Sequence, residues 1–442
     1  MLFSNKDLKK LMIPLIFEQM LVMLVGMCDT VMVSSVGEAA VSGVSLVDMI
    51  NQLIFAVLSA LATGGAVISS QYIGHRDKKS ACKTANQLSI VVLAAGVLIM
   101  LLVLAGDRAI LSLVFGAIEP EVMENAVIYF LISGLSYPFL ALYNAGGALF
   151  RSMGNSKITL QVSLVMNLVN IVFNSVFIFG FQMGAAGAAL GSLIARAVAA
   201  VVINLLLRNQ NLDVHYTKWE RPFLHMDTVK KILYIGIPSG VENGIFQLGR
   251  IIVVAVIAGF GTTQIAANAV ANNFDGIGCI PGNAMQLAMI TVVGQCVGAG
   301  DYKQAEYYVK KIMKISFVAF AIWDGLILLT LPWTLQIYAL SEATMKLAKI
   351  LIFIHDGMAI FLWTPAFVLP NALRAGNDVK FTMGISIFSM FAFRVATSFV
   401  LGAHFGMGAV GVWIAMIIDW VFRTTLFVWR FCSKKWERVR LV

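Results

Sequence analysis

This chain of 442 residues has little charge. Charged residues make up 12% of it and hydrophobic residues 59%, with a mean hydropathy of +0.85, whereas soluble domains carry about 25% charged residues. The composition excludes an ordinary soluble domain and indicates a protein that crosses a membrane many times. The net charge of +9 does not predict a nucleic acid partner, because the basic residues gather on one side of the predicted membrane.

Cysteine pairs and catalytic motifs are missing as well. The five cysteines are scattered, and none forms a CxxC pair or another ligand-like spacing, so we expect neither structural disulfides nor zinc. There is no HExxH, no nucleophile elbow and no phosphate-binding loop, so the sequence predicts no enzyme and no cofactor. A cleavable leader is not predicted either, because Pro14 and Glu18 interrupt a first apolar run that is long enough to span a bilayer.

Long apolar runs, bounded by charges or by Gly and Pro, are what the sequence does have. They predict an all-α polytopic membrane protein with twelve transmembrane helices. Several runs exceed the roughly 20 residues that a bilayer needs, which indicates tilt or kinks. The predicted spans are 11–34, 40–73, 84–106, 122–150, 157–180, 185–208, 229–260, 263–298, 308–332, 343–373, 379–402 and 406–430.

The distribution of Lys and Arg predicts the topology. With the amino terminus in the cytoplasm, 25 of the 32 Lys and Arg residues fall in inner segments, and only three fall in outer ones. Cytoplasmic loops of membrane proteins are enriched in these residues. We therefore expect a multi-pass protein of the plasma (inner) membrane with both termini in the cytoplasm.

The chain repeats itself at an offset of 224 residues. IPLIFE at 13–18 returns as IPSGVE at 237–242, and Asp77 returns as Asp301. Because six spans separate the repeated elements, both halves enter the membrane in the same sense, as in transporters whose halves rock about a shared cleft. The predicted parts are an amino-terminal six-helix lobe at 1–208, a cytoplasmic linker at 209–228 and a pseudo-symmetric six-helix lobe at 229–442.

Ionisable side chains within predicted spans need a reason to be there, because burying one at the bilayer centre costs at least about 2.5 to 3.5 kcal/mol. Most of those in this chain are acidic. Acids that face a cavity attract cations, so we expect a cationic drug, Na⁺ or H⁺ as the partner, and we expect the arginines to neutralise some acids in fixed pairs. The acids are Glu18, Asp29, Asp48, Glu242, Asp275, Asp324, Asp356 and Asp419, and the arginines are Arg196, Arg250, Arg394 and Arg423.

Two of these acids are predicted to share one face of the first span. Glu18 and Asp29 stand 11 residues apart, which brings them back to nearly one face, about 16 Å apart along the axis. Pro14 removes a backbone hydrogen bond and gives this helix a place to bend. A functional hinge and a static proline at a helix start are both compatible with the sequence.

The fifth span carries three amides. Asn170 and Asn174 stand at positions i and i+4 on one face, and Asn167 precedes them. Their oxygens could coordinate a hard cation beside a carboxylate, or the amides could join neighbouring helices. The residues alone leave both interpretations open.

Several segments, taken in order, resemble the multidrug and toxic compound extrusion (MATE) family. The resemblance covers essentially the whole chain. It implies a secondary antiporter with two six-helix lobes that exports organic cations in exchange for Na⁺ or H⁺. The segments are the run from 13 to 37, SSQYIGHRDKKSA at 69–81, NIVFNSVFIFG at 170–180, and the loops RSMGN at 151–155 and RAGND at 374–378.

The resemblance implies a cation site in the amino lobe. Asp29 matches the family's first-helix aspartate, and Pro14 matches the proline at which that helix is proposed to bend. Asn174 stands where some members carry a second aspartate, and Ser192 stands where they carry a threonine. The predicted coupling site, and Na⁺ site if that is the ion, is Asp29, Asn170, Asn174 and Ser192, with Glu18 as a further candidate.

The resemblance also implies candidates in the second lobe. Glu242 matches a seventh-helix glutamate that one branch uses for Na⁺. The tenth-helix aspartate of that branch falls on Trp363 here, and Asp356 lies seven residues earlier on roughly the same face, so a site role and a structural role are both open for it. For Asp275, the third candidate, and for Asp324 and Asp419 we favour structural pairing.

We therefore expect an antiporter that uses H⁺ or Na⁺ to export cationic or amphipathic organic compounds by alternating access. An ion taken up by Asp29 would weaken the hold on a cationic substrate. The alternative is a lipid-linked oligosaccharide flippase of related architecture, which would carry extra helices and a basic cleft. We expect the protein to be a monomer surrounded by membrane lipid.

Overall fold

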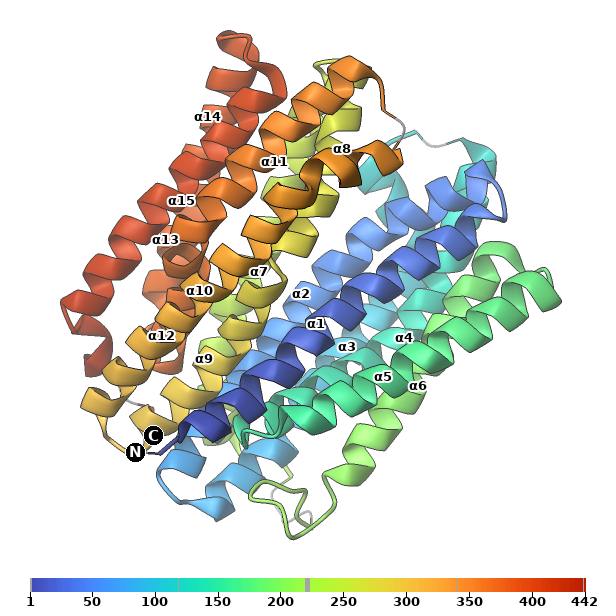
Figure 1. Ribbon diagram of the computed structural model, residues 1–442. Helices are drawn as coiled ribbons and strands as arrows, with labels where there is room; N and C mark the ends of the chain where they lie inside the picture. Colours follow the sequence, from blue (N-terminus) through green and yellow to red (C-terminus); the bar gives the residue numbers. More distant parts are fainter. Residues whose placement is uncertain (1, 118, 219–222, 339, 440) are drawn as a thin grey trace. The chain divides into compact units, whose positions relative to one another are not determined.

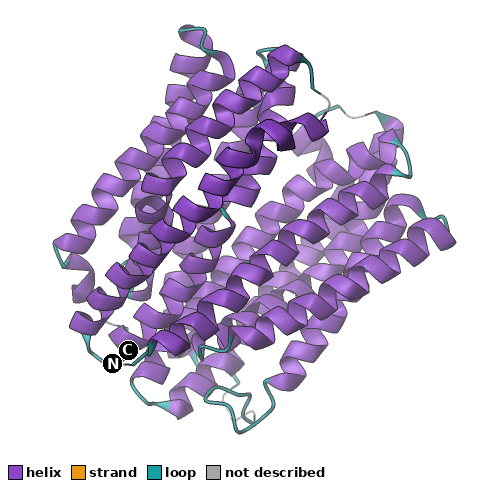
Figure 2. Ribbon diagram, viewed as in Figure 1, coloured by secondary structure: helices purple, strands orange, loops and turns teal. Residues whose placement is uncertain are grey.

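The computed structural model describes residues 2–117, 119–218, 223–338, 340–439 and 441–442, and it contains no strand among them (Figure 1, Figure 2). Twelve helices of this described part are long and apolar enough to cross a membrane. Each of them overlaps one of the predicted spans. The predicted fold class, an all-α protein with twelve transmembrane helices, is therefore confirmed.

The chain divides into two compact units, Ser4–Gly240 and Val241–Val442, the second including the residues before Ser4. The boundary falls within one helix, α7 (Met226–Ala258). The other helices of the amino unit are α1 (Asn5–Ser34), α2 (Glu38–Gly74), α3 (Lys78–Phe115), α4 (Pro120–Ser152), α5 (Ser156–Ser175) with a π-helical end (Val176–Gly180), and α6 (Gly184–Leu206).

The carboxy unit contains two spans that are interrupted by π-helical turns. Such turns accommodate one extra residue in a helix and are frequent at functional sites. The helices are α8 (Thr262–Gly278), α9 (Ile280–Gly298), α10 (Tyr302–Thr334), α11 (Glu342–Trp363), α12 (Leu369–Ala375), α13 (Val379–Ser389), α14 (Ala396–Ser398) and α15 (Gly408–Cys432), and the π-helical turns are Thr364–Val368, Met390–Val395 and Phe399–His404.

The repeated aspartates Asp77 and Asp301 cap equivalent helices. The carboxylate of Asp77 accepts a hydrogen bond from the backbone of Ser80, and that of Asp301 accepts one from Gln304. These bonds hold the pKa of both carboxyls below its usual range. The repeat thus fixes the start of α3 and of α10 by the same N-cap interaction.

Prolines in α1 and at the start of α9 leave carbonyl oxygens that side chains contact. Pro14 has no N–H to donate to the carbonyl of Lys10, and the hydroxyl of Ser156 on α5 lies 3.1 Å from that oxygen and 2.6 Å from the carbonyl oxygen of Leu11, so its hydrogen bond is shared between the two. Pro281 likewise leaves the carbonyl of Ile277 free, and the indole of Trp323 on α10 donates to it at 2.8 Å. Buried backbone groups in a membrane need such partners, so each break is fixed by a neighbouring helix.

Glycine allows α2 to cross the first part of α7 closely. A Cβ at Gly64 would lie 2.4 Å from the carbonyl oxygen of Ile232 and 2.9 Å from the nitrogen of Gly236. No side chain fits at these distances. This contact lies within the amino unit and holds the first part of α7 against α2.

The segment after α6 folds back onto the amino unit. Asn86 donates to Thr217 at 2.9 Å, and Tyr216 joins Ser89 and Asn204 at 2.7 and 2.6 Å. Val214 is fully buried. Residues 209–218 of the predicted linker are therefore tied to α3 and α6.

Replacing Ser156 by Ala should lower the free energy of unfolding by about 1 kcal/mol, because the carbonyl beside Pro14 loses its partner. Thermal unfolding in detergent measures this loss. In a Pro14→Ala background the N–H of residue 14 returns, and the same Ser156→Ala change should then cost little. An equal cost in both backgrounds would contradict this role for Ser156.

Candidate functional site

Three helices of the amino unit bring the predicted coupling residues together. Asn174 on α5 donates to the carboxylate of Asp29 on α1 at 2.8 Å and to the amide oxygen of Asn170 at 3.2 Å. Asn170 in turn donates to Ser192 on α6 at 3.1 Å. All four residues thus form one hydrogen-bonded chain, in which both asparagines are buried and Asp29 is partly buried.

The close packing of α5 on α6 fixes this arrangement. A Cβ at Gly191 would lie 1.9 Å from the side-chain oxygen of Asn174 and 2.9 Å from its backbone nitrogen. The amide nitrogen of Asn174 is therefore turned toward Asp29 and its oxygen toward Gly191. In this orientation Asn174 donates to the carboxylate, and direct coordination of Na⁺ would need the amide to rotate.

A second aspartate lies near Asp29. Asp48 on α2 accepts hydrogen bonds from Asn51 at 3.1 Å and Tyr129 at 3.2 Å, and it interacts electrostatically with Asp29. Arg196 on α6 is close enough to act on both carboxylates, and it donates to Ser136 at 2.6 Å. Two acidic residues, Asp29 and Asp48, and one arginine therefore lie near one another in the amino unit.

Glu18 belongs to a different cluster. Its carboxylate pairs with Arg151 on α4 at 3.5 Å and accepts a hydrogen bond from Thr159 on α5 at 2.7 Å. No hydrogen bond or ion pair joins Glu18 to Asp29 among the described residues. Both acids of α1 contact α5, through Thr159 and Asn174, as expected for one face of the helix, but they belong to separate hydrogen-bonded clusters.

The carboxy unit repeats this ion pair. Glu242, which corresponds to Glu18 at the offset of 224, pairs with Arg374 at 2.6 Å. Arg374 and Arg151 are the first residues of the two similar loops, RAGND and RSMGN. The repetition indicates that both glutamates anchor their loops.

Asp275 and Asp356, the other predicted candidates of this half, are joined by a histidine. His355 on α11 bonds Asp275 on α8 at 2.7 Å through Nε2 and Asp356 at 2.6 Å through Nδ1. The thiol of Cys279 also donates to Asp275, at 3.1 Å. The imidazole, only 1% exposed, lies edge-on to Trp413 and Trp420 of α15.

Asp324 on α10 extends this cluster. It is completely buried, and neither of its carboxylate oxygens has a hydrogen-bond partner among the described residues. A Cβ at Gly278 would lie 3.2 Å from Asp324 and 3.1 Å from Asp356, so a glycine lets the two acids approach. The bond from Trp323 to Ile277 holds α10 at this place.

Asp419 has the fixed pairing that the sequence favoured. Arg423 donates to its carboxylate at 2.9 Å, and Arg394 lies 3.9 Å from it. Ser389 also donates to the carboxylate. Arg250, in contrast, has no hydrogen bond or ion pair with any described residue.

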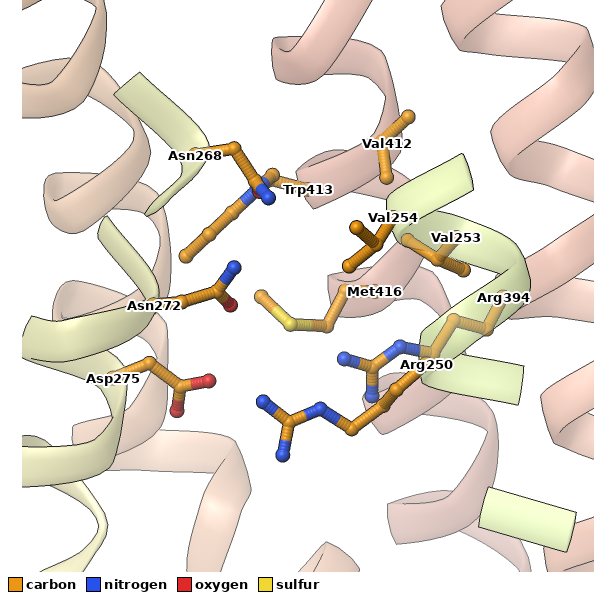
Figure 3. Close-up of a pocket in the computed structure, with 10 residues that line it drawn as sticks. All are labelled: Arg250, Val253, Val254, Asn268, Asn272, Asp275, Arg394, Val412, Trp413 and Met416. Atoms are coloured by element: carbon orange, nitrogen blue, oxygen red, sulfur yellow. The ribbon is translucent and has the colours of Figure 1, made fainter. Parts of the chain in front are cut away.

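A cavity of about 290 Å³ lies within the carboxy unit. Its charged lining residues are two acids, Glu242 and Asp275, and four arginines, and its flat apolar walls include Phe367 and Trp420. A smaller cavity of about 30 Å³ adjoins it through Arg250, Arg394 and Asp275 (Figure 3).

The fold and these sites are typical of a polytopic membrane transporter. The described part of the chain has twelve helices long and apolar enough to span a bilayer, each unit contains hydrogen-bonded acids, and the carboxy unit has a charged cavity suited to binding small molecules or ions. The chain belongs to the MatE family, whose model matches residues 14–176 and 238–400. This match confirms the resemblance seen in the sequence and assigns the chain to a family of transporters rather than enzymes. The two matched segments also reproduce the offset of 224.

Relatives and solved structures agree with this assignment. The chain is 26% identical to a probable multidrug resistance protein NorM of Thermotoga maritima over 98% of this chain and 93% of that protein. It is 28% identical to the uncharacterized transporter YisQ of Bacillus subtilis over 96% and 93%. The fold matches a MOP superfamily transporter from Pyrococcus furiosus with a TM-score of 0.90 at 22% identity, over 98% and 97% of the two chains.

Sequence reasoning missed three residues that the structure brings into these sites. Arg374 was considered only as a loop marker, Asp48 only as one acid among several, and His355 not at all. The roles of Asp48 and Arg374 depend on contacts with residues 81 and 132 positions away in the sequence, which no local pattern predicts. His355 is a single histidine that belongs to no motif. The Glu18–Arg151 pair, once known, would have indicated Glu242–Arg374 through the repeat.

Replacing Gly191 by Ala should displace Asn174 from Asp29 and lower the free energy of unfolding by about 1 to 3 kcal/mol, because the new methyl has no room. Thermal unfolding in detergent tests this. Gly180→Ala is the matched control, since a Cβ there meets nothing within 4 Å. Equal stability of both variants would contradict the proposed packing role of Gly191.

Proposed function

We propose that this protein is a cation-coupled antiporter that exports cationic or amphipathic organic compounds by alternating access. Membership of the MatE family and the names of its relatives, several of them probable multidrug resistance proteins, support multidrug efflux. The observation that carries the coupling is the bonded chain from Asp29 to Ser192. The lobes would be 1–208 and 229–442, joined at 209–228, in a monomer of the plasma membrane with both termini in the cytoplasm.

Coupling would depend on the charge of Asp29. Its carboxylate has one amide donor, Asn174, and an acidic neighbour, Asp48, so binding of H⁺ would relieve repulsion between two acids at low dielectric. Na⁺ would do the same if the amides of Asn170 and Asn174 rotated to offer oxygens. In either case the neutralised site would favour a different state of α1, whose flexible point is Pro14.

The second half would contribute through His355 rather than Glu242. The carboxylate of Glu242 is engaged by Arg374, whereas His355 connects Asp275, at the cavity wall, with the buried acids Asp356 and Asp324. An imidazole that receives a proton at Nε2 can release one at Nδ1. This would move a proton from Asp275 to Asp356.

The oligosaccharide flippase is not favoured. The family model and the named relatives point to multidrug transporters, and the described part of the chain has twelve spans without the extra helices expected of such a flippase. Na⁺ and H⁺ both stay open as the coupling ion.

Asp29→Asn should abolish efflux driven by an ion gradient while leaving insertion and folding intact, because the amide cannot take up H⁺ and has no negative charge to hold Na⁺. Efflux of a fluorescent cationic dye from vesicles, driven separately by pH and Na⁺ gradients, measures this and identifies the ion. Asp213→Asn, which changes an exposed acid outside the spans, is the control. Undiminished efflux in Asp29→Asn would remove Asp29 from the mechanism.

His355→Gln should reduce efflux driven by a pH gradient about tenfold or more, since the connection between Asp275 and Asp356 is lost. Dye binding at equilibrium should change little. His404→Gln, at an exposed histidine, is the matched control. If His355→Gln transports like the control, the imidazole has no part in proton movement.

A further inference from the structure

The repeat allows the amino-half coupling site to be compared with its counterpart in the carboxy half. At the offset of 224, Asp29 corresponds to Val253 and Asp48 to Asn272, so both acids are lost. Asn170 corresponds to Arg394. The counterpart of an acidic site is therefore a basic one.

These counterpart residues do meet in space. Val253, Asn272 and Arg394 all line the smaller cavity of the carboxy unit, together with Arg250. Arg250 and Arg394 enter from one side, and Asn272 and Asp275 lie on the other (Figure 3). Both arginines also line the cavity of about 290 Å³.

The acids at this cavity already have partners. Glu242 pairs with Arg374 at 2.6 Å, and Asp275 pairs with His355 at 2.7 Å. Arg250 acts on Asp275 electrostatically but forms no ion pair within 4.0 Å with any described residue.

Arg394 is only partly compensated. It lies 3.9 Å from Asp419, a carboxylate that Arg423 occupies more closely, and its Nε has no hydrogen-bond partner among the described residues. Guanidinium groups carry five N–H donors in a planar fork that fits carboxylate, sulfonate or phosphate oxygens. The cavity therefore has an excess of positive charge and N–H donors of Arg250 and Arg394 that a ligand can use.

The walls beside these arginines are flat and apolar. The guanidinium of Arg394 lies 5.3 Å from the ring centre of Phe246, and that of Arg423 lies 5.4 Å from the ring centre of Phe367. Trp363 and Trp420 also line the cavity. Such walls suit the apolar or aromatic body of a small molecule.

We propose that the carboxy-half cavity binds amphipathic organic anions, with the acidic group held by Arg250 and Arg394 and the apolar body against the aromatic walls. The proposal narrows the amphipathic substrates of the proposed function to those with an acidic group at this cavity, and it rests on that function for the step of export. A purely cationic ligand would face two guanidinium groups here and is disfavoured.

A matched pair of probes tests the charge preference. Naphthalene-2-sulfonate and 2-naphthyltrimethylammonium share one ring system and carry opposite charges. The partition of each ligand into protein-free detergent is measured and subtracted. We expect the purified full chain to bind the sulfonate at least about tenfold more tightly than the ammonium compound. Arg250→Gln should weaken sulfonate binding about tenfold or more and leave ammonium binding unchanged or tighter.

The controls separate this proposal from antiport. Arg208→Gln removes an exposed arginine of the amino unit and should bind like the unaltered protein. Binding is measured at equilibrium without an ion gradient, so its outcome does not depend on antiport. Should Arg394→Gln fail to fold, Arg250→Lys takes its place. This variant keeps the charge and should retain part of the affinity. Tighter binding of the ammonium probe, an Arg250→Gln variant that binds the sulfonate normally, or full displacement of the sulfonate by millimolar chloride or sulfate would each overturn the proposal.

Discussion

The structure depends on one constraint: inside a membrane protein, a charged or polar group must find its partner within the protein. Groups that form an ion pair with another helix hold the fold together, as in the pairs Glu18–Arg151 and Glu242–Arg374. Groups whose partners are incomplete, such as Asp324 and Arg250, are costly to keep for stability alone. The degree of pairing therefore separates structural charges from candidates for binding.

The repeat preserves the structural charges and changes the charges that are candidates for binding. The glutamate–arginine pair, the aspartate caps of α3 and α10 and the glycine after α1 recur in both halves. The residues around Asp29 do not recur, since Val253 and Arg394 stand at the equivalent positions. Each half thus keeps the same frame while its interior has a different charge, so binding sites can diverge without loss of the fold.

The sequence predicted the fold well because its signals are local. Span length, hydropathy and basic loops each act over about 20 to 30 residues, and a repeat with a fixed offset can be read directly. The chain from Asp29 to Ser192 was predictable from Asn170 and Asn174 on one helical face together with the family resemblance. Helical periodicity also placed Glu18 on the face of Asp29, about 16 Å away, but it could not predict the pairing of Glu18 with Arg151 on another helix.

The remaining part of the site could not be predicted, because it depends on which charges neutralise each other. From sequence, acids outnumbered arginines in the spans, and this favoured cations as the ligands. In the carboxy half, contacts between α7, α8, α11 and α15 determine which charges remain available to a ligand. There, Asp275 and Asp419 are occupied by His355 and Arg423, and the lining of the larger cavity contains four arginines but only two acids.

An acidic site in one half and a basic cavity in the other alter how coupling has to be understood. If ion and substrate shared one carboxylate, the arrival of one would expel the other by direct competition. A substrate whose acidic group is held by Arg250 and Arg394 does not compete for Asp29. Coupling would then require that each ligand favour a different conformation of the whole protein, since two ligands at separate sites affect each other only through states for which their affinities differ. Pro14, which leaves the carbonyl of Lys10 without its backbone donor, would be the place where α1 differs between such states.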